Sequence, residues 1–478
     1  MSIRPSCSLV ALAFAGLFLP SCLQKTDSPV VDSARAQPDV ILIVIDALRR
    51  DHLGMYGYNK PTSPGMDSLA ANGTIFDNAY SHGSQTFNST ASLLTSKYFP
   101  HLLPRPDSKR IEDLSSETAA RHSRVPILAA SNLTLAESLA QGGYQTLGIF
   151  TNPHHHSSSG FWQGFDVARY LSPRKGDVAY ARGPKIHQAF FEWYDEERDS
   201  GPYFAYLHFM DVHNPYRPPR FLRKQFVTVK GRDLYRKGVP EGDRIPTEDD
   251  LQYMIALYDA EIRFVDLVLE NLLHGLRDRD ALENTILVIT SDHGDEFMDH
   301  GGLGHGSTLE RELIQVPLVI AGSLSEVRRE TALSRHIDVA PTILELAGLP
   351  SSAQFEGRSL LSSETGAQEE SLEAASSFAA VAKLRSLTTQ EWHFTFDPKG
   401  PQTRLYRLAS DPKGLVDLSE EYPAVTQNFL TDLGKLEALR ALSAQQALDA
   451  APDHPGGEER HVNGAVLQQL EALGYIDP

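Results

Sequence analysis

The sequence predicts an α/β protein in which a large, mostly parallel sheet is flanked by helices. Continuous runs of branched and aromatic apolar residues recur along the chain. Such runs are typical of strands that are buried on both faces of a parallel sheet. Stretches with helical periodicity alternate with these runs, and regular alternation of strands and helices indicates an α/β fold.

The predicted strands share a continuous apolar character. The first, DVILIVID, occupies residues 39–46, and the others cover residues 144–150, 203–210, 285–290 and 316–320. The predicted helices between and after them cover residues 132–143, 250–276 and 335–349. In the first helix, Asn132 is a candidate cap and Gly142-Gly143 a candidate stop.

The C-terminal part, residues 351–478, is predicted to form a small α+β subdomain. Residues 362–377 are acidic and poor in apolar side chains, which is typical of a loop. Two strand-like pieces follow at residues 378–387 and 391–396 and would form a small second sheet. An amphipathic closing helix is predicted at residues 464–476. The large domain is then expected to cover residues 38–350.

The N-terminus has the pattern of an export signal. An apolar run from Leu9 to Leu19 follows a single arginine and is too short to span a bilayer as a stable helix. It ends in Leu-Pro-Ser-Cys, which resembles the lipobox of bacterial lipoproteins. The resemblance implies a signal peptide over 1–21, a lipid on Cys22, a polar tether over 22–37 and a membrane-anchored protein of the bacterial cell envelope. The alternative is an ordinary signal peptide that is cleaved nearby.

Charge and cysteine content exclude other classes. The chain has 478 residues and a formal net charge of −18, which argues against nucleic acid as a partner, because phosphate backbones are bound through Lys and Arg. Its two cysteines, Cys7 and Cys22, both lie in the N-terminal segment. The mature protein is therefore expected to contain no disulfide and no cysteine nucleophile.

Carboxylates and imidazoles follow three of the predicted strands. Asp46 ends the first run, Asp211 and His213 follow the run 203–210, and Asp292 and His293 follow 285–290. Because ligands of open α/β sheets bind at the carboxyl ends of the strands, these side chains are expected to meet at one edge. Aspartate oxygen and histidine nitrogen suit Zn, Mn or Mg, so the pattern predicts a metal site.

Thr86 lies at the start of an apolar helical stretch, ASLLT. A hydroxyl at a helix start is usually a cap. The free N–H groups and the dipole at this position also favour an anion. Beside a metal, such a hydroxyl can instead lose its proton and attack a tetrahedral anionic centre.

Several motifs, in order over roughly residues 38–350, resemble the sulfatase family of the alkaline-phosphatase-like superfamily. They are DVILIVIDALRRDHLGMYGY, FDNAYSHGSQTFNSTASLLTSKYFP, LHFMDVHNPYRPP, LYDAEIRFVD, ILVITSDHGDEFMDHGGLGHGSTLERELIQVPLVI and HIDVAPTILELAGLP. RLYRLASDPKGLVDLSEE resembles the C-terminal subdomain of the family. The resemblance implies an ester hydrolase that uses a divalent metal.

The family's metal and nucleophile motifs are altered in this chain. The usual pair of aspartates after the first strand is Asp46-Ala47, so one oxygen ligand is missing. The usual Cys-x-Pro-x-Arg motif is TFNST, which places Thr86 at the nucleophile position and Thr90 at the arginine position. Because threonine cannot become formylglycine, none is expected. The usual Gly-Lys-x-His segment is also not evident in the corresponding stretch, GIFTNPHHH.

The resemblance implies a role for each matching residue. Asp46, Asp292, His293 and Thr86 would hold a divalent metal (Zn, Mn or Ca), and Thr86 would attack the substrate. His213 would protonate the leaving group. Two further residues, Asp211 and His305, would contact a second metal or the anion. The histidines 154–156 are interpreted as a loop run, and Asp295, Glu296, Asp299 and His300 as support for the metal pair or as loop structure.

The sequence thus predicts a metal-dependent hydrolase that cleaves a sulfuric or phosphoric ester of a small molecule or glycan. The choice between a sulfate and a phosphate ester as substrate stays open. Water readily hydrolyses a phosphothreonine, whereas turnover through a sulfothreonine requires two S–O displacements. The alternative is a non-catalytic lipoprotein that binds a sulfated or phosphorylated glycan. The altered nucleophile and arginine positions favour this alternative, and the retained Asp and His residues oppose it.

Overall fold

The computed structural model describes residues 37–98, 127–173, 180–235, 245–361, 375–379, 384–398 and 402–450. These residues all belong to one compact unit, Gln37–Pro478. The predicted signal peptide (1–21), Cys22, nearly all of the tether, most of the acidic loop and the helix at 464–476 lie outside the described residues. The boundary between residues 350 and 351 stays a prediction.

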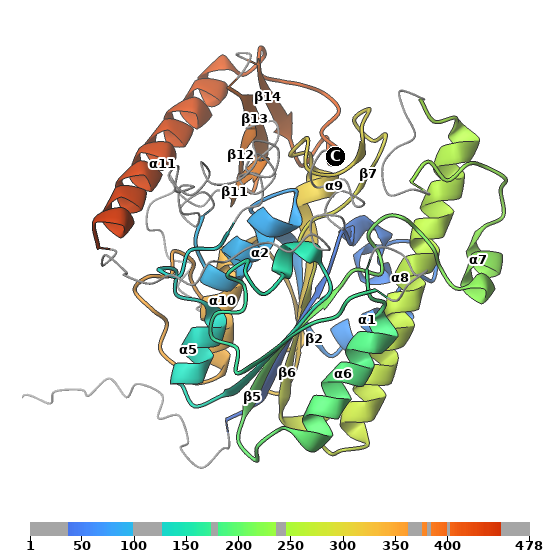
Figure 1. The fold of residues 1–478 in the computed structure, drawn as a ribbon. Helices are drawn as coiled ribbons and strands as arrows, with labels where there is room; N and C mark the ends of the chain where they lie inside the picture. Colours follow the sequence, from blue (N-terminus) through green and yellow to red (C-terminus); the bar gives the residue numbers. More distant parts are fainter. Residues whose placement is uncertain are drawn as a thin grey trace, which may run out of the picture. The chain divides into compact units, whose positions relative to one another are not determined.

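An eight-stranded sheet has the strand order β10-β2-β9-β6-β1-β5-β3-β4 (Figure 1). In chain order its strands are β1 (Asp39–Ile45), β2 (Gly73–Tyr80), β3 (Gln145–Phe150), β4 (Val167–Tyr170), β5 (Tyr203–Phe209), β6 (Thr285–Thr290), β9 (Gln315–Gly322) and β10 (Arg328–Arg335). β9 pairs antiparallel with β2 and β6, and the other pairs in this sheet are parallel. The predicted fold class is therefore confirmed.

The predicted strands correspond to β1, β3, β5, β6 and β9. β2, β4 and β10 were not predicted, because polar residues interrupt their sequences, which read GTIFDNAY, VARY and RRETALSR. β4 and β10 are the edge strands, where one side of the backbone lacks a neighbour and side chains reach solvent.

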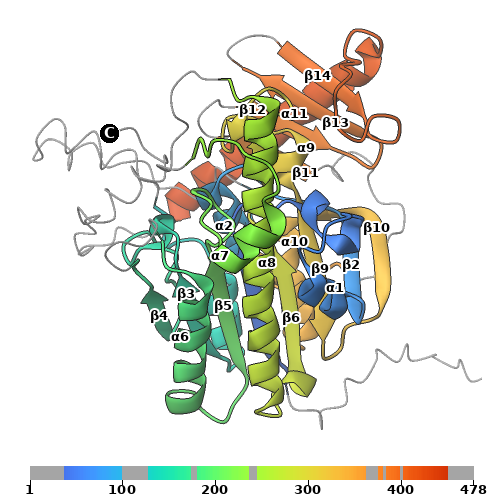
Figure 2. The same cartoon turned by 90° about the vertical axis from the view of Figure 1, so that its right-hand side faces the viewer.

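Helices cover both faces of the sheet (Figures 1 and 2). One face carries α1 (Pro64–Ala70), α6 (Gly183–Glu196) and α8 (Glu248–Arg277), and the other carries α2 (Thr86–Thr95), α5 (Leu135–Gln141) and α10 (His336–Leu346). In β1, Ile41 and Ile43 pack in the first core, and Leu42 and Val44 pack in the second. Burial on both faces explains the continuous apolar run.

The start of α5 differs from the prediction. Thr134, not Asn132, is the cap: its Oγ1 accepts a hydrogen bond from the backbone N–H of Glu137 at 3.1 Å. The Glu137 carboxylate in turn accepts from the Thr134 N–H at 2.8 Å, which completes a capping box. The predicted stop is confirmed, since the helix ends at Gln141 and Gly143 has a left-handed φ of 89°.

Smaller elements complete the described structure. They are α7 (Arg220–Phe226), α9 (Arg311–Ile314), the pair β7 (Glu296–Phe297) and β8 (Leu303–Gly304), and a second sheet with the order β11 (Ala375–Ala379), β12 (Leu384–Thr388), β13 (Trp392–Asp397) and β14 (Gln402–Arg407). The predicted small second sheet is thus confirmed. A helix that was not predicted, α11 (Pro423–Ala450), packs on this sheet, where the Phe429 and Phe394 rings stack with centroids 5.3 Å apart.

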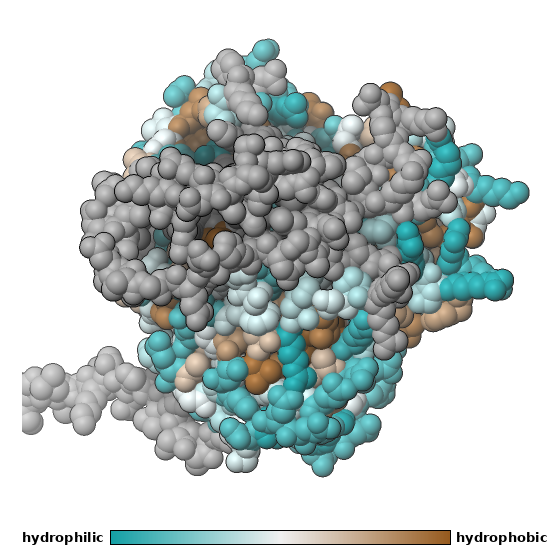
Figure 3. Space-filling model, in the orientation of Figure 1, coloured by the Kyte–Doolittle hydropathy of each residue, from teal (hydrophilic) through white to brown (hydrophobic). Residues whose placement is uncertain are grey.

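Among the described residues, no helix combines the length and apolar character that a bilayer span requires. On the described part of the face in Figure 3, hydrophilic and hydrophobic residues are interspersed.

Candidate active site

The candidate site lies where the three central strands end. In the sheet register, Val44 of β1 pairs with His208 of β5 on one side and with Thr290 of β6 on the other. Asp46 comes two residues after Val44, and Asp292 comes two residues after Thr290, so both lie just beyond the ends of their paired strands. The predicted meeting of side chains from segments far apart in sequence is therefore seen for β1 and β6.

Two buried carboxylates form the centre of the site. Asp46 and Asp292 are both 0% exposed. Asp292 Oδ1 accepts the backbone N–H groups of Ala47 (3.1 Å) and His293 (2.9 Å), which fixes the orientation of the carboxylate. Asp292 Oδ2 and Asp46 Oδ1 have no hydrogen-bond partner among the described residues. Each of these two oxygens lies 3.6 Å from His293 Nε2.

The electrostatics of this arrangement favour a cation. Burial, followed by the charge of Asp292, raises the pKa of the Asp46 carboxyl well above its usual range. Ionising both carboxylates in this position is costly unless positive charge lies between them. The unpaired oxygens and the imidazole nitrogen beside them are the donor set that a divalent metal uses, so the residues present fit such an ion.

His293 is held in the form that binds a metal. Its Nδ1 lies 2.8 Å from the carbonyl oxygen of Gly294, so Nδ1 carries the proton and donates it to that carbonyl. Nε2 then presents its lone pair toward the carboxylates. A backbone carbonyl that fixes the tautomer in this way is a common support for metal-binding histidines.

Thr86 lies directly beside this group. It is the first residue of α2, and its Oγ1 is 3.3 Å from Asp46 Oδ2 and 3.4 Å from His293 Nε2. The residue before it, Gln85, occupies the cap position and makes no side-chain capping bond. The Thr86 hydroxyl thus faces the carboxylate and the imidazole, and its role as the attacking group stays a prediction.

Asn152 is a member of the site that the sequence analysis missed. It follows β3, and its Nδ2 donates to Asp46 Oδ2 at 2.8 Å and lies 3.2 Å from Thr86 Oγ1. The signal was present in the sequence, because Asn152 is a polar residue just after a predicted strand, as Asp46 is. His154, in the same loop, is buried, and burial, together with the charges of nearby histidines that include His213, lowers its pKa to about 3. His154 is therefore part of the site's surroundings.

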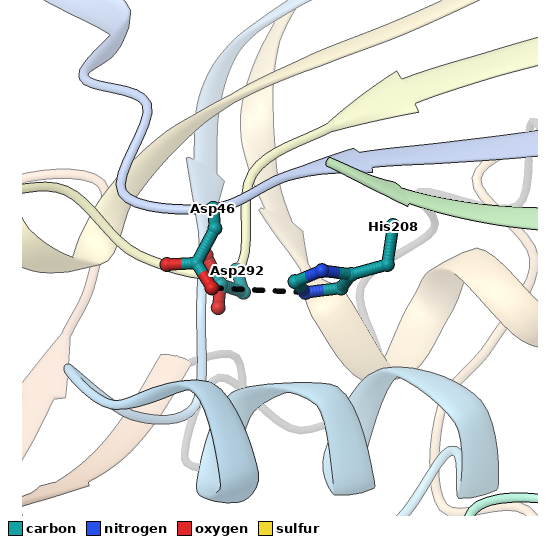
Figure 4. Close-up of side chains that lie close together, drawn as sticks. All are labelled: Asp46, His208 and Asp292. Carbon is teal, nitrogen blue, oxygen red and sulfur yellow. Dashed lines mark ion pairs between the residues drawn. The ribbon is translucent and has the colours of Figure 1, made fainter. Parts of the chain in front are cut away.

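His208 was also missed, because it lies inside a strand rather than after one. It is 0% exposed, and Figure 4 shows its ring directed toward Asp46, with Asp292 beyond. His208 Nε2 is 3.9 Å from Asp46 Oδ2. Asp46, His208 and Asp292 offer ligand atoms that all lie within 4.8 Å of one another.

His213 and His305 come together next to His293. Their Nε2 atoms are 3.0 Å apart, and the His305 ring stacks on the His293 ring with centroids 4.2 Å apart. His213 Nδ1 lies 2.6 Å from the carbonyl oxygen of Asn214, to which it donates. Burial lowers the pKa of His213 to about 4 and that of His305 well below its usual value.

Asp211 has a different partner from the one expected. Its Oδ1 accepts from Arg182 Nε at 2.7 Å, and Arg182 Nη2 also donates to Glu261 at 2.7 Å. Asp211 Oδ1 is thus held in a buried ion pair, whereas Asp211 Oδ2 has no hydrogen-bond partner among the described residues. The expected role of Asp211 as a second metal ligand or anion contact stays a prediction.

The acidic residues after the metal pair support the loop itself. Arg49 donates to Asp51, to Asp299 and to the carbonyl oxygen of Asp295. The Asp295 carboxylate accepts from the Tyr216 hydroxyl. These bonds agree with the interpretation of the stretch as loop structure near the site.

Comparisons with known proteins agree with this fold. The model of the sulfatase family matches residues 38–349. An arylsulfatase of Clostridium perfringens is 25% identical over 457 residues, which cover 81% of this chain and 91% of the relative. The phosphonate monoester hydrolase of Agrobacterium radiobacter is similar in structure, with a TM-score of 0.64, 21% identity and coverage of 84% of this chain and 96% of that one. A protein solved in complex with its substrate D-glucosamine-2-N,6-O-disulfate has a TM-score of 0.64 at 20% identity, covering 88% of this chain and 100% of that one.

The mostly parallel sheet, the helices on both faces and the site at the strand ends define an alkaline-phosphatase-like hydrolase fold. Within that class the family match spans about two thirds of the chain. The chain belongs to the sulfatase family and is a hydrolase that acts on ester bonds.

Proposed function

We propose that this hydrolase cleaves a sulfuric or phosphoric ester through Thr86 as nucleophile at a divalent-metal site. The observation that carries the proposal is the position of the Thr86 hydroxyl, which lies 3.3 Å from Asp46 Oδ2 and 3.4 Å from His293 Nε2. A threonine that served only as a helix cap would bond to backbone N–H groups instead. The proposed substrate class is a small ester or a sulfated or phosphorylated glycan.

The proposed metal ligands are Asp46, Asp292, His293 and Thr86. Two buried carboxylate oxygens without a hydrogen-bond partner among the described residues, together with the free edge of His293, support this assignment. When bound, the ion supplies positive charge that lowers the pKa of the Thr86 hydroxyl and stabilises the negative charge of the reacting group. Asn152 donates to Asp46 Oδ2 and holds that carboxylate against the hydroxyl.

The reaction follows from the positions of the side chains. The Thr86 hydroxyl passes its proton to Asp46 Oδ2, toward which it donates at 3.3 Å, as Oγ1 attacks the sulfur or phosphorus atom. The bond from that atom to the leaving oxygen breaks as the new bond forms. His213 is the proposed general acid: because its own proton lies on Nδ1 against the Asn214 carbonyl, Nε2 first takes up a proton from solvent and then passes it to the leaving alkoxide. Water then attacks the same sulfur or phosphorus atom, the bond to Thr86 breaks, and the inorganic anion is released with the threonine hydroxyl restored.

The test is an assay of the chain lacking residues 1–22 with an aryl sulfate, an aryl phosphate monoester and an aryl phosphodiester, each with Zn, Mn or Ca. Thr86→Ala is expected to lower turnover at least ~10³-fold, which is the scale of losing a nucleophile. Thr95→Ala is the matched control, because this threonine ends the same helix and its hydroxyl bonds only to the Ala91 carbonyl among the described residues. Full activity of Thr86→Ala would refute the nucleophile.

The three substrates separate the two ester classes. Thr86-dependent turnover of the phosphate esters would identify a sulfatase fold that acts on phosphate. Thr86-dependent turnover of the aryl sulfate would instead mean that threonine can replace formylglycine, and the chemical objection to a sulfothreonine would be wrong.

The second candidate is a non-catalytic lipoprotein that binds a sulfated or phosphorylated glycan. Thr86 and Thr90, which stand at the family's cysteine and arginine positions, favour it. Elemental analysis of the purified protein distinguishes the two, because only the catalytic proposal requires a bound divalent ion. A protein that neither contains nor takes up Zn, Mn or Ca would support the binder.

We also propose that the protein is exported and anchored in the bacterial cell envelope through a lipid on Cys22. The apolar run and the Leu-Pro-Ser-Cys sequence support this. Mass spectrometry of the mature N-terminus tests it, and an unmodified Cys22 or a different cleavage site would refute it.

A further inference from the structure

We propose that His208 is an additional metal ligand, which replaces the missing aspartate at position 47 and makes the site selective for a transition metal over calcium. This inference rests on the proposed function, since it concerns the same metal. The supporting observations are the lost donor at Ala47, the position of His208 and the unsatisfied nitrogens of its ring.

Ala47 offers the site no side-chain donor. It is fully buried, directly follows Asp46, and contributes only its backbone N–H, which donates to Asp292 Oδ1 at 3.1 Å. A cation at this site therefore has one carboxylate fewer than the family's paired aspartates would supply. Calcium takes six to eight oxygen ligands, so the loss of a carboxylate weighs heavily against it.

His208 comes from the strand next to β1 and reaches the same carboxylates. Its Nε2 is 3.9 Å from Asp46 Oδ2, and Figure 4 shows the ring pointing at Asp46. Two ligands with bonds of about 2.1 Å to a tetrahedral zinc ion lie about 3.4 Å apart. The separation of 3.9 Å in the structure exceeds this by about 0.5 Å, which small rotations of the two side chains would close.

The ring nitrogens of His208 lack hydrogen-bond partners among the described residues. The ring is 0% exposed, and neither Nδ1 nor Nε2 makes a hydrogen bond to any residue in the described part of the chain. Leaving a buried polar group without a partner is costly, so such a group calls for a ligand. The edge of the His155 ring packs on it with centroids 4.7 Å apart and keeps it in place.

The donor set that includes His208 is mixed in nitrogen and oxygen. Two imidazoles, His208 and His293, would then join two carboxylates. A mixed nitrogen and oxygen donor set of this kind favours zinc, manganese or iron(II) over calcium.

His336 provides a matched control outside the proposed ligand set. It is also 0% exposed, and it also lies near Asp292. Its ring nitrogens, however, lie 3.2 Å from Thr290 Oγ1 and 3.3 Å from Ser89 Oγ, so both have hydroxyl partners. The two histidines thus differ in whether the ring is already satisfied.

The experiment measures metal binding by the full-length chain and by the variants His208→Ala, His208→Gln and His336→Gln. Zinc affinity is measured by chelator competition, and the coordination of cobalt(II) by its visible absorption. For both His208 variants we expect zinc affinity to fall at least ~10²-fold, which exceeds the effect of most outer-sphere changes, and the cobalt spectrum to change. His336→Gln is expected to keep both properties, and the wild-type chain to retain zinc in excess calcium.

The outcomes separate this inference from the proposed function. If the wild-type chain binds zinc but His208→Gln has the affinity and cobalt spectrum of His336→Gln, the role of His208 is refuted and the metal site stands. If the wild-type chain prefers calcium, the selectivity is refuted. If the wild-type chain binds no divalent ion, the proposed metal site is refuted, and the role of His208 is refuted with it. Circular dichroism checks folding, and if His208→Ala does not fold, His208→Gln, which fills the same space without an imidazole, decides.

Discussion

Replacing Arg182 by methionine is expected to destabilise the protein strongly and in a pH-dependent way. Arg182 bridges Asp211 and Glu261, with both N···O distances at 2.7 Å, and both carboxylates are 0% exposed. Methionine keeps most of the side-chain volume but leaves the carboxylates without their cation. Breaking a buried ion pair in this way costs about 3–5 kcal/mol of unfolding free energy.

The pH dependence follows from Glu261. Burial raises the pKa of this carboxyl from 4.5 to about 8, and the charge of Asp211 adds to the rise while Arg182 opposes it. Because the folded-state pKa is raised, the contribution of Glu261 to stability is fully present below pH 4.5 and is lost as the pH rises through 8. Because Arg182 lowers the pKa of Glu261, the variant keeps the proton on Glu261 at pH 8.5, where the wild type has released it. The loss of unfolding free energy should therefore be larger at pH 8.5 than at pH 5.5 by about 0.7 kcal/mol, since pH 8.5 lies half a unit above 8.

Urea unfolding of wild type and Arg182→Met at pH 5.5 and pH 8.5 measures this cost. The matched control is Arg279→Met, because Arg279 also pairs with a carboxylate at 2.6 Å, but Asp195 is 47% exposed. Such surface pairs are worth about 0–1 kcal/mol. A loss below about 1 kcal/mol for Arg182→Met at pH 8.5, or an equal loss at both pH values, would refute the reasoning.

Two further substitutions test contacts near the site. His300→Gln should lower the free energy of unfolding by about 1–2 kcal/mol at pH 6 and leave it unchanged at pH 10. The reason is that Glu312 raises the pKa of His300 to about 9, so the stabilisation by the charged imidazole is lost as the pH rises through that value. Thermal unfolding at both pH values measures the difference, which pH-independent losses would contradict. Gly294→Ala should destabilise by more than about 3 kcal/mol, since the added Cβ would lie 1.9 Å from the Glu312 carbonyl oxygen. A well-folded Gly294→Ala protein of normal stability would exclude that close approach.

The sequence by itself determined the fold class and part of the site. The apolar runs of β1, β5 and β6 are long and unbroken because these strands are buried on both faces, which is a local pattern. Asp46, Asp292 and His293 could be predicted for the same reason, since a polar residue directly after such a run must lie at the end of a strand. The edge strand β10 could not be predicted, because nearly all of its side chains are exposed or half-buried and it therefore lacks an apolar run.

Only the tertiary structure decided which side chains meet. His208 lies within β5, and its direction toward Asp46 depends on the register between β5 and β1. Asn152 reaches Asp46 because β3 pairs with β5, although about 100 residues separate the two side chains in the sequence. Asp211 follows a central strand as Asp46 does, yet it pairs with Arg182. Sequence position therefore places a residue at the sheet edge, whereas strand order and register select its partner, because they set which side chains lie within bonding distance.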